Sequence, residues 1–184
     1  KCTSLTSITL PKSLSEIKNE IFSQCTELES VTFSSKVEYI RSGTFYNCTK
    51  LKNIVFPTSL YYIGSHAFSC CTSLKTIELP ESVLSIGYEC FAHCTGLEDI
   101  KMHNKISTIE TMAFINCSKL TSVVLPNSLQ VISSGLFYCC ENLVSITVGS
   151  GLKDVYWNAF ENASKLEKFV ALNDEPSTFH VIDG

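Results

Sequence analysis

The sequence predicts a solenoid built from stacked copies of one short unit, and three observations carry that prediction. Leucine recurs with a 23-residue spacing at eight successive places in the 184-residue chain. Cysteine recurs with the same 23-residue spacing at seven places, and phenylalanine does so at seven others. No insertion or deletion interrupts this period. A fixed internal period between about 20 and 50 residues is typical of repeat architectures.

The first half of each unit has the pattern of a β-strand. Three residues after each leucine stands a β-branched residue, or Phe169 in the last unit, and two residues later another apolar one, so alternate side chains can point into a core. Strands of successive units would pair in parallel about 4.8 Å apart. The leucine column is Leu5, Leu28, Leu51, Leu74, Leu97, Leu120, Leu143 and Leu166.

The second half of each unit turns the chain back. Proline, which cannot donate a backbone hydrogen bond, follows the strand in four units and would end it. A serine two residues later can bond the turning backbone. The apolar step Leu60–Ile63 predicts a second, shorter strand, and the stretch to Cys71 a tight turn or a single helical turn. The prolines and serines are Pro11, Pro57, Pro80 and Pro126, and Ser13, Ser59, Ser82 and Ser128.

Each unit carries about seven apolar positions, too few to bury themselves, so neighbouring units must cover one another. The prediction is a leucine-rich-repeat solenoid, a right-handed α/β or β-rich superhelix, with a parallel β-sheet on its concave face and short strands and turns elsewhere. Residues 1–172 would form one domain of seven to eight repeats. Residues 173–184 lose the pattern and would be a degenerate tail or cap.

The unit Cys71-Thr72-Ser73-Leu74-Lys75-Thr76-Ile77-Glu78-Leu79-Pro80-Glu81-Ser82-Val83-Leu84-Ser85-Ile86-Gly87, followed by Phe91, resembles the BspA-like leucine-rich repeat, also called the Treponema pallidum type. The resemblance covers residues 2–172. It implies a surface or secreted protein of a mucosal bacterium or protist that adheres to host or matrix proteins. Some protist members look instead like intracellular proteins whose repeats are attached to another domain. The family brings no catalytic residues.

Composition excludes several classes of function. Lys plus Arg number 14 against 18 Asp plus Glu, which argues against a nucleic-acid partner because such a protein needs a basic face. No apolar run approaches the roughly 18–20 residues of a membrane-spanning helix. The chain has neither an initiator Met nor a signal peptide and begins inside a repeat, so we read it as a piece of a longer protein. Its compartment is therefore not indicated by the missing signal.

The cysteines are better explained by the repeat than by chemistry. We name as the thiol column the seven that recur with the 23-residue period: Cys2, Cys25, Cys48, Cys71, Cys94, Cys117 and Cys140. Parallel side chains one coil apart lie beyond the roughly 3.5–4.5 Å between the Cβ atoms of a disulfide, and metal pairs of the Cys-x-x-Cys type are missing. All seven are predicted to be buried and reduced. Cys90 would also be packed, whereas Cys70 and Cys139 would be exposed.

No metal, cofactor or catalytic residue is predicted, and the chain is expected not to be an enzyme. The histidines His66, His93, His103 and His180 are scattered and have no obvious carboxylate partners. Asn47, Asn116 and Asn162 each begin an Asn-x-Ser/Thr sequon. They share one repeat position, where asparagine suits a left-handed turn, so the sequons can be a by-product of structure.

Two surfaces are candidates for binding. The outward positions of the first strands are predicted to contact a partner through Asn53, Val55, Thr76, Glu78, Asp99, Lys101 and Val124. A rival aromatic patch is Tyr39, Tyr61 and Tyr62.

The predicted function is a non-enzymatic protein–protein interaction module, the adhesion region of a larger surface protein. Its partner would be a host, matrix or signalling protein, and the chain would be monomeric and extracellular or on the cell surface. The alternative is a cytoplasmic scaffold that positions an attached signalling enzyme such as a phosphatase.

Overall fold

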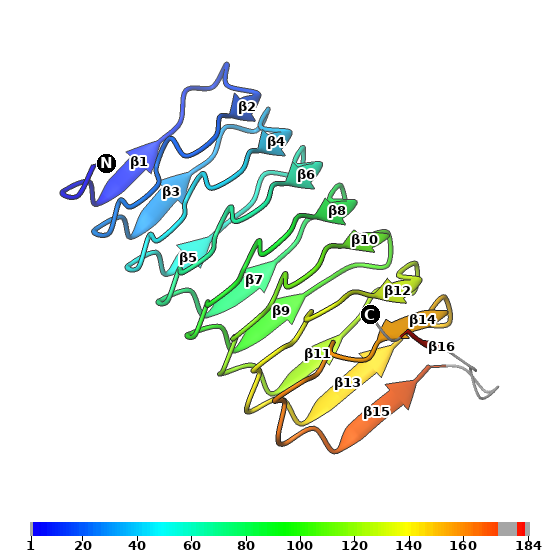
Figure 1. The fold of residues 1–184 in the computed structure, drawn as a ribbon. Helices are drawn as coiled ribbons and strands as arrows, with labels where there is room; N and C mark the ends of the chain where they lie inside the picture. The colour runs from blue at the N-terminus through cyan, green and yellow to red at the C-terminus, as the bar shows by residue number, and fades with distance from the viewer. Residues whose placement is uncertain (1, 173–179, 183–184) are drawn as a thin grey trace.

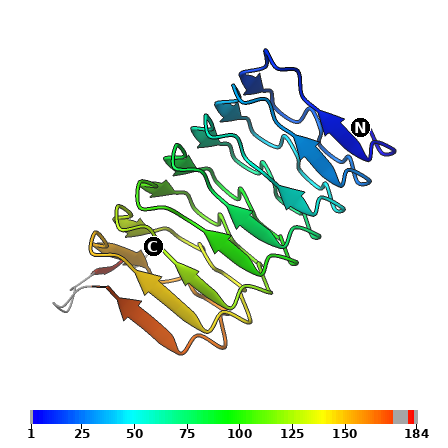
Figure 2. The same cartoon turned by 180° about the vertical axis from the view of Figure 1, so that it is seen from behind.

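A computed structural model describes residues 2–172 and 180–182. The chain winds through a stack of similar coils, each with one strand on each of two faces, and the two ends of the chain lie toward opposite ends of the stack (Figure 1). The view from behind shows the same stack (Figure 2). Over the described residues every regular element is a strand, and the stretch 64–70 is a series of turns, so the corner is not a helical turn. The β-rich alternative is the one observed.

The first strand of each coil lies on one side of the stack. These strands are parallel, and paired residues stand one repeat apart in the sequence, as in Ser7↔Ser30 and Ser145↔Lys168. The predicted period is therefore also the register of the sheet. The strands are β1 (Ser7–Thr9), β3 (Ser30–Thr32), β5 (Asn53–Ile54), β7 (Thr76–Glu78), β9 (Asp99–Lys101), β11 (Ser122–Val124), β13 (Ser145–Val148) and β15 (Lys168–Ala171).

The second strand of each coil is shorter and lies on the other side. Its register follows the same period, as in Glu16↔Tyr39, except at the end, where Asp154 pairs with His180, beyond the position one period later. β16 thus continues the second sheet within the predicted tail at 173–184, of which residues 173–179 and 183–184 lie outside the described residues. The strands are β2 (Glu16–Ile17), β4 (Tyr39–Ile40), β6 (Tyr62–Ile63), β8 (Ser85–Ile86), β10 (Thr108–Ile109), β12 (Val131–Ile132), β14 (Asp154–Tyr156) and β16 (His180–Ile182).

Between the two sheets, the apolar columns form one continuous core. Leucines from Leu28 to Leu143 and phenylalanines from Phe45 to Phe137 are fully buried. Neighbouring phenylalanine rings from Phe22 to Phe160 stack with centroids 5.2–5.9 Å apart and planes within 3–14° of parallel. Offset stacking adds to the burial of each ring. At the ends, Leu5 and Phe160 are only half-buried because, among the described residues, a full coil covers each of them on one side only.

The thiol column is a row of hydrogen-bond donors. The sulfur of each cysteine from Cys48 to Cys140 lies 3.1–3.3 Å from the carbonyl oxygen of the core phenylalanine in the preceding coil. All ten cysteines are free, and Cys25 to Cys140 of the column are buried, as is Cys90. Cys2 is exposed, so the prediction of seven buried thiols is wrong there: no earlier coil covers it. Cys70 and Cys139 are partly exposed.

The polar columns also hold the corners. The hydroxyls of Ser59, Ser82 and Ser128 donate to carbonyls of the preceding coil over 2.6–2.7 Å, which confirms their predicted role. At Gly87, an added Cβ would lie 2.7 Å from the backbone nitrogen of Ser65, so coils approach too closely there for any side chain.

The asparagine position is left-handed in every coil where it lies between two others, as predicted. Gln24, Asn47, Cys70, His93, Asn116, Cys139 and Asn162 have φ between 56° and 62°. Asparagine visits this region more readily than most residues. The sequon asparagines therefore occupy a corner that the fold requires.

The hydrogen bonding of both sheets is interrupted. The first sheet is divided between β5 and β7 and again between β9 and β11. The second is divided once, between β10 and β12, where the Ser133 hydroxyl donates to the Ile109 carbonyl over 2.7 Å. At this position in the coils before it, a backbone N–H donates, as Glu110 does to Ile86. At these places the strand pairing stops, while backbone hydrogen bonds at the corners still join the coils, as from Met112 to Ser134.

Candidate functional site

We name as the front face the outward side chains of β1, β3, β5, β7, β9, β11, β13 and β15. The predicted contact residues Asn53, Val55, Thr76, Glu78, Asp99, Lys101 and Val124 are all exposed on it. The register places Thr76 beside Asp99 and Glu78 beside Lys101. The structure thus brings these residues together in two adjacent rows, as the alternation of the strand pattern predicted.

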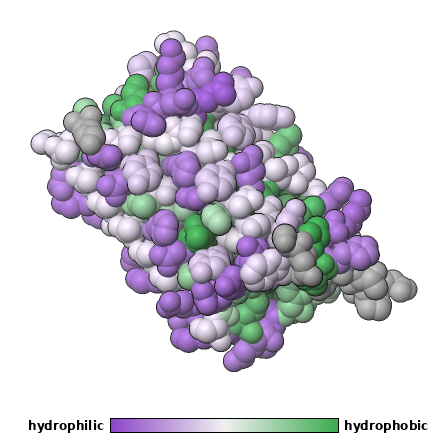
Figure 3. All heavy atoms as spheres, viewed as in Figure 1, coloured by the Kyte–Doolittle hydropathy of each residue, from purple (hydrophilic) through white to green (hydrophobic). Residues whose placement is uncertain are grey.

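The row Val55–Glu78–Lys101–Val124 has an apolar residue at each end and charges in its middle. Val55 is 83% exposed and Val124 is 56% exposed. The ammonium of Lys101 lies 3.9 Å from a carboxylate oxygen of Glu78, and both side chains are well exposed, so the pair adds little to stability. In the view of Figure 1, hydrophobic side chains form small separate groups rather than one continuous stripe (Figure 3).

A shallow hollow lies where the first sheet opens between β5 and β7. It is lined by Val55 and Phe56 from one coil and by Glu78, Pro80 and Glu81 from the next. The hollow therefore joins an exposed apolar side chain to two carboxylates. It could receive an apolar group that carries a positive charge.

The aromatic patch lies on the second sheet. Tyr39 and Tyr62 are paired in register and half-buried, and Tyr61 is 48% exposed. The rings of Tyr39 and Tyr61 meet edge to face with centroids 6.2 Å apart, and the Arg41 guanidinium lies 5.0 Å from the centre of the Tyr39 ring. These contacts tie the rings of Tyr39 and Tyr61 to one another, so the patch is partly structural.

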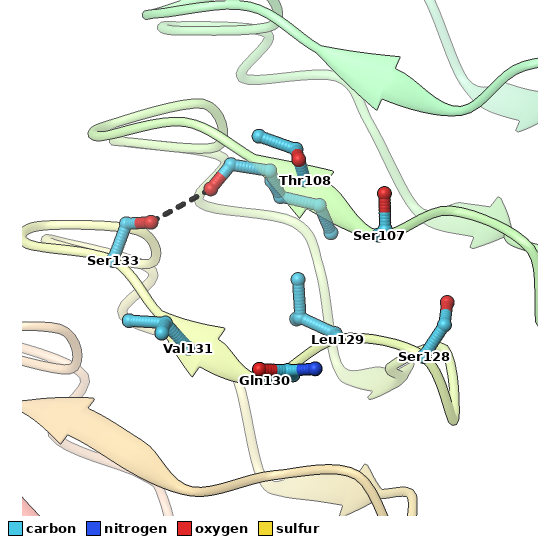
Figure 4. A pocket seen from close by; sticks show the side chains of 8 residues that line it. Ser107, Thr108, Ser128, Leu129, Gln130, Val131 and Ser133 are labelled. Atoms are coloured by element: carbon cyan, nitrogen blue, oxygen red, sulfur yellow. Dashed lines mark hydrogen bonds between the residues drawn. The ribbon is translucent and has the colours of Figure 1, made fainter.

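A second hollow lies at the opening between β10 and β12. Side chains from both coils line it, among them Ser107, Thr108, Leu129, Gln130 and Val131 (Figure 4). The bond from Ser133 to Ile109 bridges one end of it. Sequence reasoning missed this feature because the side chains involved are ordinary strand residues.

The buried ionisable side chains of the described residues are mostly thiols of the repeat. Burial raises the pKa of the Cys48, Cys94 and Cys140 thiols to about 12, so they stay protonated and are poor nucleophiles. No group of three or more potential metal ligands occurs in the part of the chain that the structure describes. Contrary to the expectation from sequence, His66, His103 and His180 do lie within 4.0 Å of carboxylates, of Glu89, Glu81 and Asp154 respectively.

Stacked coils with two parallel sheets, matched apolar columns and a register equal to the 23-residue period define the leucine-rich-repeat class of solenoid. The sequence profile of the BspA type leucine rich repeat region matches residues 1–97 and 38–167 in six copies. The chain therefore belongs to the BspA-type leucine-rich-repeat family, as the quoted unit predicted.

Solved structures agree with this assignment. A leucine-rich-repeat protein of Treponema pallidum is 32% identical with a TM-score of 0.82, over 88% of this chain and 78% of its own. One from Eubacterium ventriosum is 28% identical with a TM-score of 0.81, over 96% of this chain and 46% of its own. A leucine-rich cell surface protein of Faecalibacterium prausnitzii shares the fold at 23% identity and a TM-score of 0.63, over 94% of this chain and 61% of its own.

The chain therefore spans only about half to four-fifths of the length of these proteins. No curated protein matches it. Among the described residues there is no helix long and apolar enough to cross a membrane.

Proposed function

We propose that the chain is a non-enzymatic protein-binding module and that the front face is its contact surface. The observation that carries the proposal is the exposure of Val55 and Val124 at either end of one row. Their shared column holds Thr, Glu and Lys in other coils as well as Val170, so the fold does not require valine there. With about 4.8 Å between strands, the two side chains lie about 14 Å apart.

The partner that fits this row is a protein surface with two separated apolar groups around a charged or polar centre. Apolar groups at the centre of an interface are the usual source of binding energy, whereas exposed charges set register and specificity. The front face offers both within one row of four neighbouring coils. Membership of the BspA-type family and the likeness to a cell surface protein support a place outside the cell, where the partner is a host or matrix protein.

The test is direct binding to a panel of immobilised extracellular-matrix proteins, followed by variants. Thr76→Arg and Lys101→Glu are expected to weaken whichever interaction is found at least about tenfold, because Lys101 lies at the centre of the row and Thr76 lies in the adjacent row, two residues before Glu78 on the same strand. Thr108→Arg, an exposed change on the second sheet, is the matched control and should leave affinity unchanged. Equal affinity of all variants would reject the front face as the contact surface.

The second candidate is a scaffold that positions an attached signalling enzyme inside the cell. It is supported by the incomplete coverage of the related structures, which leaves room for further domains in such proteins. The same variants, tested by capture of cytosolic proteins from the source cell, separate the two readings: front-face dependence with a cytosolic partner only would favour the scaffold.

A further inference from the structure

A small hollow lies at a corner of the stack, away from the front face. One corner position is left-handed in successive coils, with φ between 50° and 62°, and its residues are Glu20, Gly43, His66, Glu89, Met112 and Gly135. At Gly43 the column lacks a side chain, and the space this leaves is lined by Glu20, Ser42, Tyr46 and His66, with Ser23 and Gln24 at one side.

The walls of this hollow are held by the neighbouring coils. The Gly43 amide donates to the Ser65 carbonyl over 2.9 Å, and the Tyr46 amide donates back to the Gly43 carbonyl over 3.0 Å. The Glu20 side chain leans over the glycine: a Cβ added at Gly43 would lie 3.0 Å from the Cγ of Glu20 and 4.0 Å from one carboxylate oxygen. The carboxylate therefore occupies the mouth of the hollow because Gly43 leaves it room.

The carboxylate of Glu20 is not neutralised by a basic side chain of the described residues. Among the described residues it makes no ion pair, whereas nearby Glu16 is paired with Arg41 and Glu89 lies 3.3 Å from the Nδ1 atom of His66. The imidazole of His66 is thus directed to the following coil, where its ring also meets Tyr88 edge to face at 5.2 Å. The hollow combines an unpaired carboxylate with the exposed Tyr46 ring.

We propose that this hollow is a binding site for the cationic group of an arginine or lysine side chain on a protein partner. A guanidinium can pair with a carboxylate through two N–H donors and can lie against an aromatic ring at the same time. Both partners of such a cation, Glu20 and Tyr46, line the hollow from adjacent coils. The site is separate from the front face. Because it would bind a single cationic group, it can be tested with a small probe and without knowing the partner.

The probe is N-acetyl-arginine amide, titrated into the isotopically labelled chain and followed by amide chemical shifts. The amides of Ser42, Gly43 and Tyr46 are expected to shift in a saturable way. N-acetyl-citrulline amide has nearly the same shape but no charge, and it should produce at least about threefold weaker binding, the size expected when one exposed ion pair is lost. Equal shifts with both probes would overturn the proposal.

Two variants locate the site. Glu20→Gln removes the charge and keeps the shape, and it should weaken the arginine probe about three- to fivefold. Gly43→Asn should abolish the shifts because its side chain displaces Glu20, while the same left-handed position already accepts Glu, His and Met. Gly135→Asn makes the same change at the matched corner, where Met112 stands in the place that Glu20 takes beside Gly43, and should leave binding intact.

Each outcome decides the proposal. Unchanged binding by Glu20→Gln, or equal losses in Gly43→Asn and Gly135→Asn, would refute it. Should Gly43→Asn fail to fold, Glu20→Gln and the citrulline comparison still decide the matter. A failure here leaves the front-face proposal standing, because the two experiments use different surfaces and different probes.

Discussion

The thiol of Cys71 donates a hydrogen bond of 3.3 Å to the backbone carbonyl of Phe45, which also accepts the amide of Cys48. The same relationship recurs in four other coils. A cysteine is small enough for the core and can still satisfy a buried acceptor of the preceding coil. The column is thus a device for joining coils rather than a redox or metal site.

Removing one thiol should weaken the stack. Cys94→Ala deletes the 3.2 Å bond to the Phe68 carbonyl at a fully buried position, and is expected to lower the free energy of unfolding by about 1–2 kcal/mol. Urea unfolding measures this. Cys139→Ala, at a partly exposed corner, is the control and should change stability by less than about 0.5 kcal/mol. Equal effects of the two variants would show that the bond is energetically unimportant.

Stability should fall in alkali. The native pKa values of Cys48, Cys94 and Cys140 are about 12, above the ordinary value of 9.0, because burial disfavours the thiolate. Above pH 9 the unfolded chain loses these protons while the native state keeps them. Each thiol then costs about 1.4 kcal/mol of stability for every further pH unit until its native pKa is reached.

Denaturation followed between pH 7 and 11 measures this effect. Below pH 9 the thiols should contribute no pH dependence, because they are protonated in both states. In the Cys94→Ala variant the alkaline slope should be shallower by one thiol. A slope identical to that of the parent chain would contradict the assignment of the alkaline loss to the buried column.

A charge in the core should unfold the chain. Ile86 is fully buried in β8 between β6 and β10, so Ile86→Asp places a carboxylate among apolar columns and should cost about 4 kcal/mol or more. Thr108→Asp, on the outward side of the adjoining strand, should be nearly neutral. Thermal unfolding followed by circular dichroism compares them, and an unchanged melting temperature for Ile86→Asp would reject the packing described above.

Hydrogen exchange should reveal the opening between β10 and β12. The amides of Ser107 and Thr108 donate to the Leu84 carbonyl over 3.1 and 3.4 Å. Over the described residues, the corresponding amides of Gln130 and Val131 make no such bond to the coil before them. Gln130 and Val131 should therefore exchange faster than Ser107 and Thr108, which are the matched controls. Equal protection of the two pairs would mean that the ladder is closed in solution.

Much of the fold follows from the sequence because each column has a single physical role. The leucine, phenylalanine and cysteine columns predicted the core, and the strand alternation predicted which residues, such as Thr76 and Lys101, face solvent. The prediction failed for Cys2 because burial in a solenoid depends on a neighbour and not only on the residue itself.

Other features lay beyond the pattern. The longer step from β14 to β16 falls where the sequence no longer follows the repeat, and the sheet openings fall between coils that share the same repeat pattern. The hollow at Gly43 arises because this residue has no side chain where most residues of its column have one. A search for a repeat finds the residues that a column shares and passes over such an exception. The proximity of His66 to Glu89, in contrast, could have been found from the repeat, because the two residues share one column and stand one period apart.

The identity of register and period has a consequence for how such a chain can change in length. Excising residues 71–93 would rejoin two coils whose buried columns already match, so recombination between repeats could shorten or lengthen the molecule without inventing a new core. The exterior would not be conserved in this way: Val55 would come to lie beside Lys101, and the pair of Lys101 with Glu78 would vanish. In this architecture, the buried core can therefore be kept while the exposed binding surface changes.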